Sequence, residues 1–568
     1  MIFNFRRRII LVFGLVAAIA GGAASAQSPG LAETPALVSA EDLLQHWQTE
    51  NEPGLAVSVM RDGEIAFSTG RGLANLEYAV PMGPDTPVHA ASLSKQFTAF
   101  SIMLLAAEGL LTLDDDIRTY LPELYSRPEI VTIRDLLDHT GGLREQSTLF
   151  EMAGWRADDV TTQTQQWRLL ARQQGSNFPA GAQVEYSNTG YAMLARIVER
   201  VSGQSFEAFT QTRIFDPLEM HATSFHTDLA ELLPGRAYSY TPNGGGYAFQ
   251  PFNYALVGST GLQTSTADLL LWARNFQTRS VGSAEVFAMM AERADAENGR
   301  PSTFAKGQER RMYHGYVTWS HGGRDAGFRS FLLRVPAANF AVSVLANRGD
   351  VDAAAVAFAL LDAFLADDPA YEAETPPAWQ PATPEQLASF SGNYEIFPGL
   401  IFTIASDGQA LSFSVLHGEE RAPIPQIGER RFSLNPGQNI SIDFVTGPEG
   451  EVAGFDYTLG LNGSIWAPRI ELAPFEPDRV DMSGYIGRYF SEELLAAYEI
   501  SLEDGVLRAT HLRLPAVDLT PYQTDTFSGD RANFQNVEFV RTSDGSIAGC
   551  RVSGPLANDV WFQRLPPP

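Results

Sequence analysis

The segment Ala91-Ser92-Leu93-Ser94-Lys95 decides the fold expected for this chain. The chain contains only two lysines, Lys95 and Lys306, and arginine supplies its other basic side chains. An ion pair would accept either residue, whereas a proton acceptor needs an amine that gives up its proton once desolvated. We expect a helix from about Ser92 through residues 105–107 that ends at Gly109, and whose positive dipole end lowers the pKa of Lys95. The segment therefore predicts a serine nucleophile, Ser92, with an amine base one helical turn away.

A second segment, Tyr186-Ser187-Asn188, follows the turn Pro179-Ala180-Gly181. A phenol can relay the proton of a nucleophile to a leaving group, and an amide can hold a substrate carbonyl. An asparagine in a loop can also simply cap a turn. Tyr186 and Asn188 are therefore candidates for catalysis and substrate binding, respectively.

Two His-x-Gly segments compete for a third element of the site. His139-Thr140-Gly141 follows a helical segment, whereas His321-Gly322-Gly323 follows a strand pattern over residues 316–320. Glycines after a strand residue permit a substrate backbone to approach that strand closely. We therefore choose His321 and Gly323, and interpret His139 as a structural loop residue.

Composition limits the classes of function. A chain of 568 residues should form more than one domain, and 44% hydrophobic with 19% charged residues is typical of a globular protein. The net charge of −27 argues against a nucleic-acid or anionic-membrane partner. No His, Cys, Asp or Glu cluster has metal-ligand spacing and no glycine-rich phosphate loop occurs, so we expect neither a metal nor a cofactor.

Residues 1–26 are typical of a secretory signal. Arg6-Arg7-Arg8 precede an apolar run over residues 9–20, and Ala24-Ser25-Ala26 form a small-residue cleavage site. The run is shorter than the roughly 20 residues that span a bilayer. The single cysteine, Cys550, allows no intramolecular disulfide and no lipid anchor at the cleavage site. We predict a periplasmic or secreted protein without a stable membrane anchor, and its oligomeric state stays open.

Strand patterns occur at both ends of the region that follows the signal. Residues 55–60 and 64–67 form a predicted hairpin, and three further strands are expected at residues 316–320, 331–335 and 340–345. The intervening residues 115–280 are mostly helical and loop. This order predicts an α+β domain over residues 27–366, in which helices pack on one antiparallel sheet built from both ends.

An internal repeat follows a Pro-rich linker at residues 367–385. Gly392-Asn393-Tyr394 recurs as Gly487-Arg488-Tyr489, and Asp443-Phe444 recurs as Glu538-Phe539, both at an offset of 95 residues. The intervening runs are short and alternating, with little helix. We predict two all-β domains, at residues 386–474 and 475–568, as small antiparallel barrels or curled sheets.

Taken in order, Ser92-x-x-Lys95, Tyr186-x-Asn188 and His321-x-Gly323 resemble the three motifs of the serine β-lactamase and penicillin-binding-protein superfamily, in its class C-like and esterase branch. The resemblance covers about residues 35–350. It implies that Ser92 is acylated, and that Lys95 and Tyr186 share the base and acid roles. Asn188 and His321 would position the substrate, and the backbone N–H groups of Ser92 and Arg324 would form the oxyanion hole.

The chain departs from the β-lactamases at the third motif, where His-Gly-Gly replaces Lys-Thr-Gly. A histidine there resembles peptidases and esterases of the superfamily and argues against efficient β-lactam hydrolysis. The layout of one hydrolase domain and two β domains is similar to the D-aminopeptidase branch, in which a loop of the last barrel enters the active site. That likeness suggests Asp525 and Asp530 as carboxylates that would hold a substrate ammonium.

Three functions follow from these observations. The first is a serine hydrolase that acts through an acyl-enzyme on small amides or peptides with an N-terminal D-residue. The second is a carboxylesterase of the same fold, because esters and amides pass through the same acyl-enzyme. The third is a non-catalytic sensor or scaffold of the penicillin-binding type. The presence of Ser92, Lys95 and Tyr186 together counts against the third.

Overall fold

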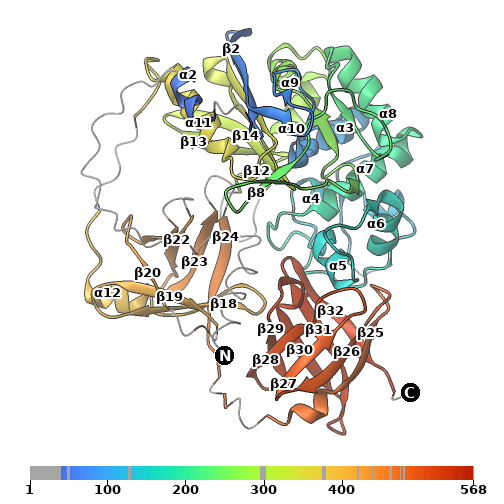
Figure 1. Ribbon diagram of the computed structural model, residues 1–568, viewed down its shortest axis with the longest axis vertical. Helices are drawn as coiled ribbons and strands as arrows, with labels where there is room; N and C mark the ends of the chain where they lie inside the picture. Colours follow the sequence, from blue (N-terminus) through green and yellow to red (C-terminus); the bar gives the residue numbers. More distant parts are fainter. Residues whose placement is uncertain are drawn as a thin grey trace.

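The computed structural model describes residues 40–47, 51–125, 129–294, 302–373, 379–416, 418, 421–435, 440–459, 464–473, 475–476 and 480–566. The predicted secretory signal lies outside these residues. Three bodies are visible in Figure 1: a mixed helix and sheet domain at the top, a first β domain below it in orange, and a second β domain in red. Within the described residues, no helix combines the length and apolar character needed to cross a membrane.

The N-terminal domain is built on an antiparallel sheet with the order β12-β13-β14-β15-β16-β1-β2. Val57 of β1 lies opposite Val344 of β16, so the two ends of the domain meet in the middle of the sheet. This confirms the predicted sheet built from both ends. The strands are β1 (Leu55–Arg61), β2 (Glu64–Arg71), β12 (Phe304–Ala305), β13 (Gln308–Tyr313), β14 (Tyr316–Asp325), β15 (Phe328–Val335) and β16 (Phe340–Ala346).

Helices cover both faces of this sheet because its central strands are apolar on both sides. Val57 and Val344 belong to a core shared with α11 (Ala353–Leu365). Ala56 and Leu345, one position along, belong to the core of the opposite face. The helices of the domain are α2 (Ala40–Leu43), α3 (Ser94–Ala107), α4 (Ile133–Leu137), α5 (Gln146–Met152), α6 (Gln163–Leu170), α7 (Asn188–Ser202), α8 (Phe206–Thr210), α9 (Thr266–Thr278), α10 (Ala284–Ala291) and α11.

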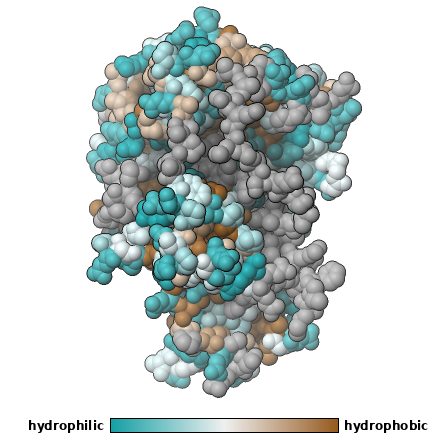
Figure 2. Space-filling view, turned by 90° about the vertical axis from the view of Figure 1, so that its left-hand side faces the viewer, coloured by the Kyte–Doolittle hydropathy of each residue, from teal (hydrophilic) through white to brown (hydrophobic). Residues whose placement is uncertain are grey.

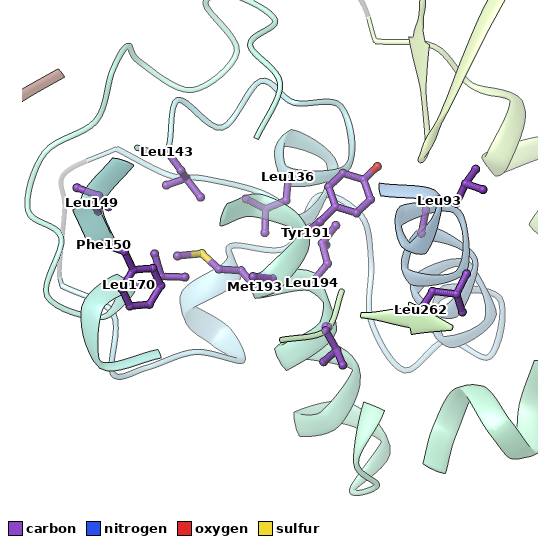
Figure 3. Packing of buried hydrophobic residues seen from close by; sticks show 14 of the residues in the cluster. Leu93, Leu136, Leu143, Leu149, Phe150, Leu170, Tyr191, Met193, Leu194 and Leu262 are labelled. Carbon is purple, nitrogen blue, oxygen red and sulfur yellow. The ribbon is translucent and has the colours of Figure 1, made fainter. Parts of the chain in front are cut away.

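Helix α7 lies in the middle of the helical cluster. The Ser187 hydroxyl caps its start by accepting the Gly190 N–H at 3.1 Å, and Gly203, with φ 70°, ends it. Figure 3 shows Tyr191, Met193 and Leu194 of this helix between Leu143 and Leu149 on one side and Leu93 and Leu262 on the other. The packing fixes the start of α7, where Asn188 lies.

Short strands and helical turns connect these elements. They are η1 (Gln45–Trp47), β3 (Leu73–Asn75), β4 (Val80–Pro81), β5 (Val88–His89), η2 (Ala91–Leu93), η3 (Ile117–Thr119), β6 (Thr161–Thr162), η4 (Gln211–Phe215), η5 (Asp216–Leu218), β7 (Ser224–Phe225), β8 (Tyr240–Asn243), β9 (Gly246–Phe249), β10 (Tyr254–Ala255), β11 (Leu262–Thr264) and η6 (Pro336–Ala338).

The first β domain is an eight-stranded sheet with the order β20-β19-β18-β17-β24-β23-β22-β21. A bridge between Gln426 and Phe432 brings its two edges together, so the sheet is nearly closed. Its elements are α12 (Pro384–Ser389), β17 (Gly392–Phe397), β18 (Leu400–Ser406), β19 (Leu411–Val415), β20 (Ala422–Ile424), β21 (Arg431–Asn435), β22 (Ile440–Thr446), β23 (Val452–Leu459) and β24 (Ser464–Ile470).

The second β domain, here called the last barrel, is closed from β25 to β32. Its elements are η9 (Met482–Tyr485), β25 (Gly487–Ser491), β26 (Ala496–Glu503), β27 (Val506–Thr510), β28 (Val517–Gln523), β29 (Thr526–Gly529), η10 (Ala532–Phe534), β30 (Asn536–Arg541), β31 (Ile547–Gly554) and β32 (Ala557–Arg564). The repeat falls on equivalent strands. The Tyr394 hydroxyl donates to the Phe390 carbonyl at 2.7 Å, and the Tyr489 hydroxyl donates to the Tyr485 carbonyl at 2.8 Å.

The two β domains differ in how they join the rest of the chain. The apolar residues of the last barrel form one continuous core with the helical cluster, whereas the first β domain has a core of its own. The last barrel lies directly beneath α5 in Figure 1. Figure 2 views the side of the molecule that carries the first β domain, and there small hydrophobic groups are interspersed among hydrophilic residues.

Candidate active site

Ser92 lies in η2, the turn between β5 and α3, and is partly exposed. The helix predicted from Ser92 therefore begins as a 3₁₀ turn and becomes α-helical at Ser94. The residue before the serine, Ala91, has φ 48°, a left-handed conformation that costs energy for a residue other than glycine. Backbone strain of this kind is commonly kept at functional sites, where it sets the direction of a side chain.

Strand β14 crosses next to this turn, and Gly323 makes the close approach possible. A Cβ at this position would lie 2.3 Å from the Ala90 carbonyl oxygen and 3.0 Å from the Ala91 Cβ. We predicted that this glycine admits a substrate backbone. In the structure, the backbone that approaches it is that of the protein's own η2.

Lys95 is completely buried, and three oxygens surround its amine. The Nζ atom donates to Ser92 Oγ at 3.2 Å, to Asn188 Oδ1 at 2.7 Å and to the Ser259 carbonyl at 2.9 Å. Burial lowers the pKa of Lys95 to about 7, against the opposing charges of Glu145 and Asp325. The shift has the predicted direction, but burial rather than the helix dipole is its main cause. At neutral pH a large fraction of the amine is therefore neutral and able to accept a proton.

Tyr186 lies on the other side of the same amine. Its ring centroid is 4.7 Å from Lys95 Nζ, and its hydroxyl forms a hydrogen bond with Ser92. Burial raises the pKa of Tyr186 well above its usual value, more than the Ser92 hydrogen bond lowers it. The phenol therefore keeps its proton at neutral pH and is placed to pass one on.

His139 belongs to the wall of this site. Its Nδ1 accepts the Ser187 N–H at 3.0 Å, and its ring stacks on Tyr186 with centroids 4.6 Å apart. Burial lowers the pKa of His139, so the ring is neutral. The structural role predicted for His139 agrees with these contacts, but the sequence interpretation missed that it supports Tyr186 directly.

Glu145 is a second residue that the sequence interpretation missed. This buried N-cap of α5 accepts the Asn188 N–H through Oε2 at 2.9 Å and the Asn188 amide through Oε1 at 3.1 Å. The amide oxygen of Asn188 is thereby turned toward Lys95. Its pairing with a residue 43 positions away has no local pattern, so no signal in the sequence indicated it.

The third motif places a neutral imidazole in the site. His321 is 4% exposed, and within the described residues its Nδ1 has no hydrogen-bond partner. Burial, assisted by the charge of Lys95, lowers the pKa of His321 to about 3.

Arg324 follows with an exposed side chain. Asp325 Oδ2, which ends β14, accepts the Thr260 hydroxyl at 2.6 Å and lies 3.0 Å from His89 Nε2.

The two carboxylates suggested for a substrate ammonium have partners inside the last barrel. Asp525 accepts the Tyr485 hydroxyl at 2.7 Å and pairs with Arg541 at 2.6 Å. Asp530 accepts the Asp518 N–H at 2.9 Å.

The structure brings the following predicted site residues together: Ser92, Lys95, Tyr186, Asn188, His321 and Gly323. The substrate role of Asp525 and Asp530 stays a prediction.

A different part of the last barrel reaches the site. The turn between β31 and β32 places the Leu556 carbonyl 2.7 Å from the Glu145 backbone nitrogen and 2.8 Å from Asn177 Nδ2, and both donate to it. The Thr148 hydroxyl donates to the neighbouring Pro555 carbonyl at 2.7 Å. The barrel therefore supports the residue that orients Asn188.

A buried ion pair reinforces this contact. Arg144 Nη1 donates to Glu493 Oε2 at 2.7 Å, and the two side chains are 4% and 8% exposed. The other guanidinium nitrogens of Arg144 donate to the Asn558 carbonyl at 2.7 Å and the Asp559 carbonyl at 2.8 Å. Arg144 directly precedes Glu145, so the pair fixes the backbone at that carboxylate.

No group of three or more His, Cys, Asp or Glu side chains in the described ranges is arranged to hold a metal ion.

Comparison with known proteins places this geometry in a wider context. A family model described as Beta-lactamase matches residues 40–365. A D-aminopeptidase of Cereibacter sphaeroides (strain ATCC 17029 / ATH 2.4.9) is 24% identical over 529 residues, which cover 90% of this chain and 96% of the relative. A D-aminopeptidase of Gluconobacter oxydans (strain 621H) is 27% identical over 298 residues, 52% of this chain and 56% of the relative. Among solved structures, an octameric penicillin-binding protein homologue from Pyrococcus abyssi superimposes with a TM-score of 0.53 and 24% identity, covering 75% of this chain and 99% of that one.

Proposed function

The chain belongs to the Beta-lactamase family and is a serine hydrolase, and we propose that it cleaves small amides or peptides that carry a free N-terminal amine, as a D-aminopeptidase does. The observation that carries this proposal is the buried amine of Lys95, held 3.2 Å from Ser92 Oγ with its pKa lowered to about 7. An amine in that state can take the proton of a serine hydroxyl.

The geometry gives each residue a step in the reaction. Lys95 Nζ accepts the proton of Ser92 as Oγ bonds to the substrate carbonyl carbon, and the carbonyl oxygen takes the negative charge. When the carbon–nitrogen bond breaks, the Tyr186 hydroxyl gives its proton to the leaving nitrogen and regains one from Lys95. Water then attacks the Ser92 ester by the reverse proton path, which releases the acid and restores the enzyme.

Two observations favour amine-bearing substrates over β-lactams. His321 is neutral, so the third motif supplies no cation at that position for a β-lactam carboxylate. The charges that act on Lys95 are those of the Glu145 and Asp325 carboxylates, which attract a substrate ammonium. The similarity to D-aminopeptidases extends over 90% of the chain and so includes the β domains.

The test is a substrate panel with matched variants. Purified protein should hydrolyse D-alanyl p-nitroanilide with higher kcat/KM than the L-alanyl compound, p-nitrophenyl esters or a chromogenic cephalosporin. A fluorophosphonate should label Ser92, as located by peptide mapping. Lys95→Arg keeps the charge but not a dissociable amine, so activity should fall by at least ~100-fold. A preference for simple esters would instead support a carboxylesterase, and labelling at another residue would overturn the proposed nucleophile.

A further inference from the structure

A cavity of about 170 Å³ lies between the sheet and helices α9 and α10. Its walls are formed mainly by the apolar side chains of Phe276, Phe287, Met290, Trp319 and Phe340. The exposed residues Gln277 and Pro336 also line it, so it opens to solvent beside them.

The cavity is separate from the site around Ser92 but close to it. Trp319 and His321 lie two positions apart on β14, so their side chains point to the same face of the sheet. In the described part of the chain, none of the residues that bond to Ser92 or Lys95 lines the cavity.

Arg334 brings a positive charge into this apolar space. The side chain is 6% exposed, and its guanidinium lies 3.5 Å from the Phe276 ring centroid. One of its N–H groups donates to Gln308 Oε1. Gln308 is itself held by the Met290 carbonyl, to which its Nε2 donates at 3.3 Å. A guanidinium carries five N–H donors, so this arrangement leaves donors for a further acceptor.

The charge of Arg334 has no counter-charge among the described residues, where no carboxylate lies within 4.0 Å of it. Buried charges in proteins are normally paired, as Arg144 is with Glu493 and Lys306 is with Asp138. Burial lowers the pKa of Arg334 to about 9, so the guanidinium stays charged at neutral pH. An anion that entered the cavity would therefore neutralise a charge that the protein leaves unpaired.

We propose that this cavity binds a small monocarboxylate with an apolar body, whose carboxylate pairs with Arg334 while the body packs against Phe287, Met290 and Trp319. A carboxylate matches the planar donors of a guanidinium and can accept two parallel hydrogen bonds. An apolar cavity of about 150 Å³ holds a benzene ring, so this one has room for a body of roughly six to eight carbon atoms. The site is independent of the proposed hydrolase activity.

The test uses the full-length protein and phenylacetate as the probe. Isothermal titration calorimetry should show one saturable site with Kd below about 1 mM, and phenylacetamide, which has the same shape without the charge, should bind at least ~30-fold more weakly. Hydrogen exchange should slow in residues 284–291 and 330–341 when phenylacetate is added. Arg334→Met should weaken binding at least ~30-fold, and Ala341→Leu, which fills the cavity and keeps the charge, should weaken it at least ~10-fold.

Ser92→Ala distinguishes this cavity from the hydrolase site and should leave phenylacetate binding unchanged. If Arg334→Met does not fold, the comparison of phenylacetate with phenylacetamide on the unmodified protein and the Ala341→Leu variant still decide the question. The proposal is overturned if phenylacetate shows no saturable binding up to about 10 mM. Equal binding of the amide, or loss of binding in Ser92→Ala, would overturn it as well.

Discussion

The two β domains share one repeated sequence pattern, but among the described residues the contacts that support the active site come from the last barrel. Its Leu556 carbonyl accepts the Glu145 N–H, and its Glu493 carboxylate pairs with the buried Arg144. The first β domain has its own core, and its Gly399 turn packs against Gln535 of the last barrel. The difference teaches that a repeat predicts the architecture of each copy, whereas the role of a copy depends on contacts outside it.

The largest effect should come from breaking the buried ion pair. Glu493→Leu removes the carboxylate that pairs with the buried Arg144 guanidinium and leaves it only the Asn558 and Asp559 carbonyls, which should lower the free energy of unfolding by about 3–5 kcal/mol. Adding Arg144→Met should recover most of that loss. Glu395→Gln in the first β domain keeps an acceptor oxygen for the Gly399 N–H, which Glu395 Oε1 accepts at 3.0 Å, so this change should cost no more than about 1 kcal/mol. Urea denaturation measures all four proteins, and equal losses for Glu493→Leu and Glu395→Gln would refute the comparison.

Removal of residues 475–568 should affect catalysis more selectively. Glu145 then loses its Leu556 acceptor, so Asn188 and Lys95 are held less firmly. A small misplacement of catalytic groups costs about 100-fold in rate. We expect a loss of that order in kcat/KM for amine-bearing amides and a smaller loss for simple esters. If the truncated protein stays folded by circular dichroism and keeps the same ratio between the two substrate types, the last barrel does not shape the site.

The pH dependence of kcat/KM gives a finer test. The neutral amine of Lys95 is the base, so activity should rise about tenfold per pH unit up to about 7 and level off above it. Glu493→Leu in the last barrel should admit water to Lys95 and so raise its pKa, because burial is what lowers it. The rise in activity should then occur at higher pH in Glu493→Leu, and at the same pH as in the unmodified protein in Glu395→Gln. Glu185, whose pKa burial also raises to about 7, is the control, and Glu185→Gln should leave the limb in place.

The lowered pKa of Lys95 also makes the free energy of unfolding depend on pH. The unfolded chain keeps the Lys95 proton up to about pH 10.4, whereas the native protein loses it at about 7. Between these values the unfolded state binds more protons, so the contribution of Lys95 to stability increases as the pH rises. Lys95→Met should remove this part of the pH dependence, and a denaturation series from pH 7 to 10 would detect it.

The smallest effect should come from single tyrosine hydroxyls. The Tyr498 hydroxyl donates to the Met152 carbonyl at 3.0 Å, across the boundary between the last barrel and α5. The Tyr394 hydroxyl donates within the first β domain. Each change to phenylalanine should cost about 1 kcal/mol of stability. Only Tyr498→Phe should also lower kcat/KM, by roughly two- to threefold, and a similar decrease in Tyr394→Phe would contradict the comparison.

Local patterns indicated which residues of the candidate site lie next to one another. Ser92 and Lys95 lie within one helical turn, and Tyr186 and Asn188 flank one helix cap, so spacing alone brings each pair together. The seven-stranded sheet was predictable in outline because alternation marks the strands at both ends of the domain. Glu145 was not predictable, because its partner is remote in sequence and a capping carboxylate has an ordinary local explanation.

The contacts of the last barrel were beyond prediction for the same reason. The likeness to the D-aminopeptidase branch suggested the region around Asp525 and Asp530, whereas the contact with the Glu145 backbone comes from Leu556. A backbone carbonyl carries no residue signature, so no pattern of amino-acid types could indicate it. The helix dipole predicted that the pKa of Lys95 is lowered. Burial is the larger cause, and it depends on Ser259 and on the packing of the helical cluster.

The contact between Arg144 and Asn558 also has a consequence in time. The two residues are 414 positions apart, and a ribosome adds about 5–20 residues per second. About 20–80 seconds therefore pass between the synthesis of the arginine and that of the carbonyl that receives it. During this interval Arg144 must remain hydrated, and Glu145 lacks its Leu556 support. Ser92 and Lys95 are thus synthesised long before Leu556, whose carbonyl supports Glu145. The active site is therefore complete only after the last barrel has been made.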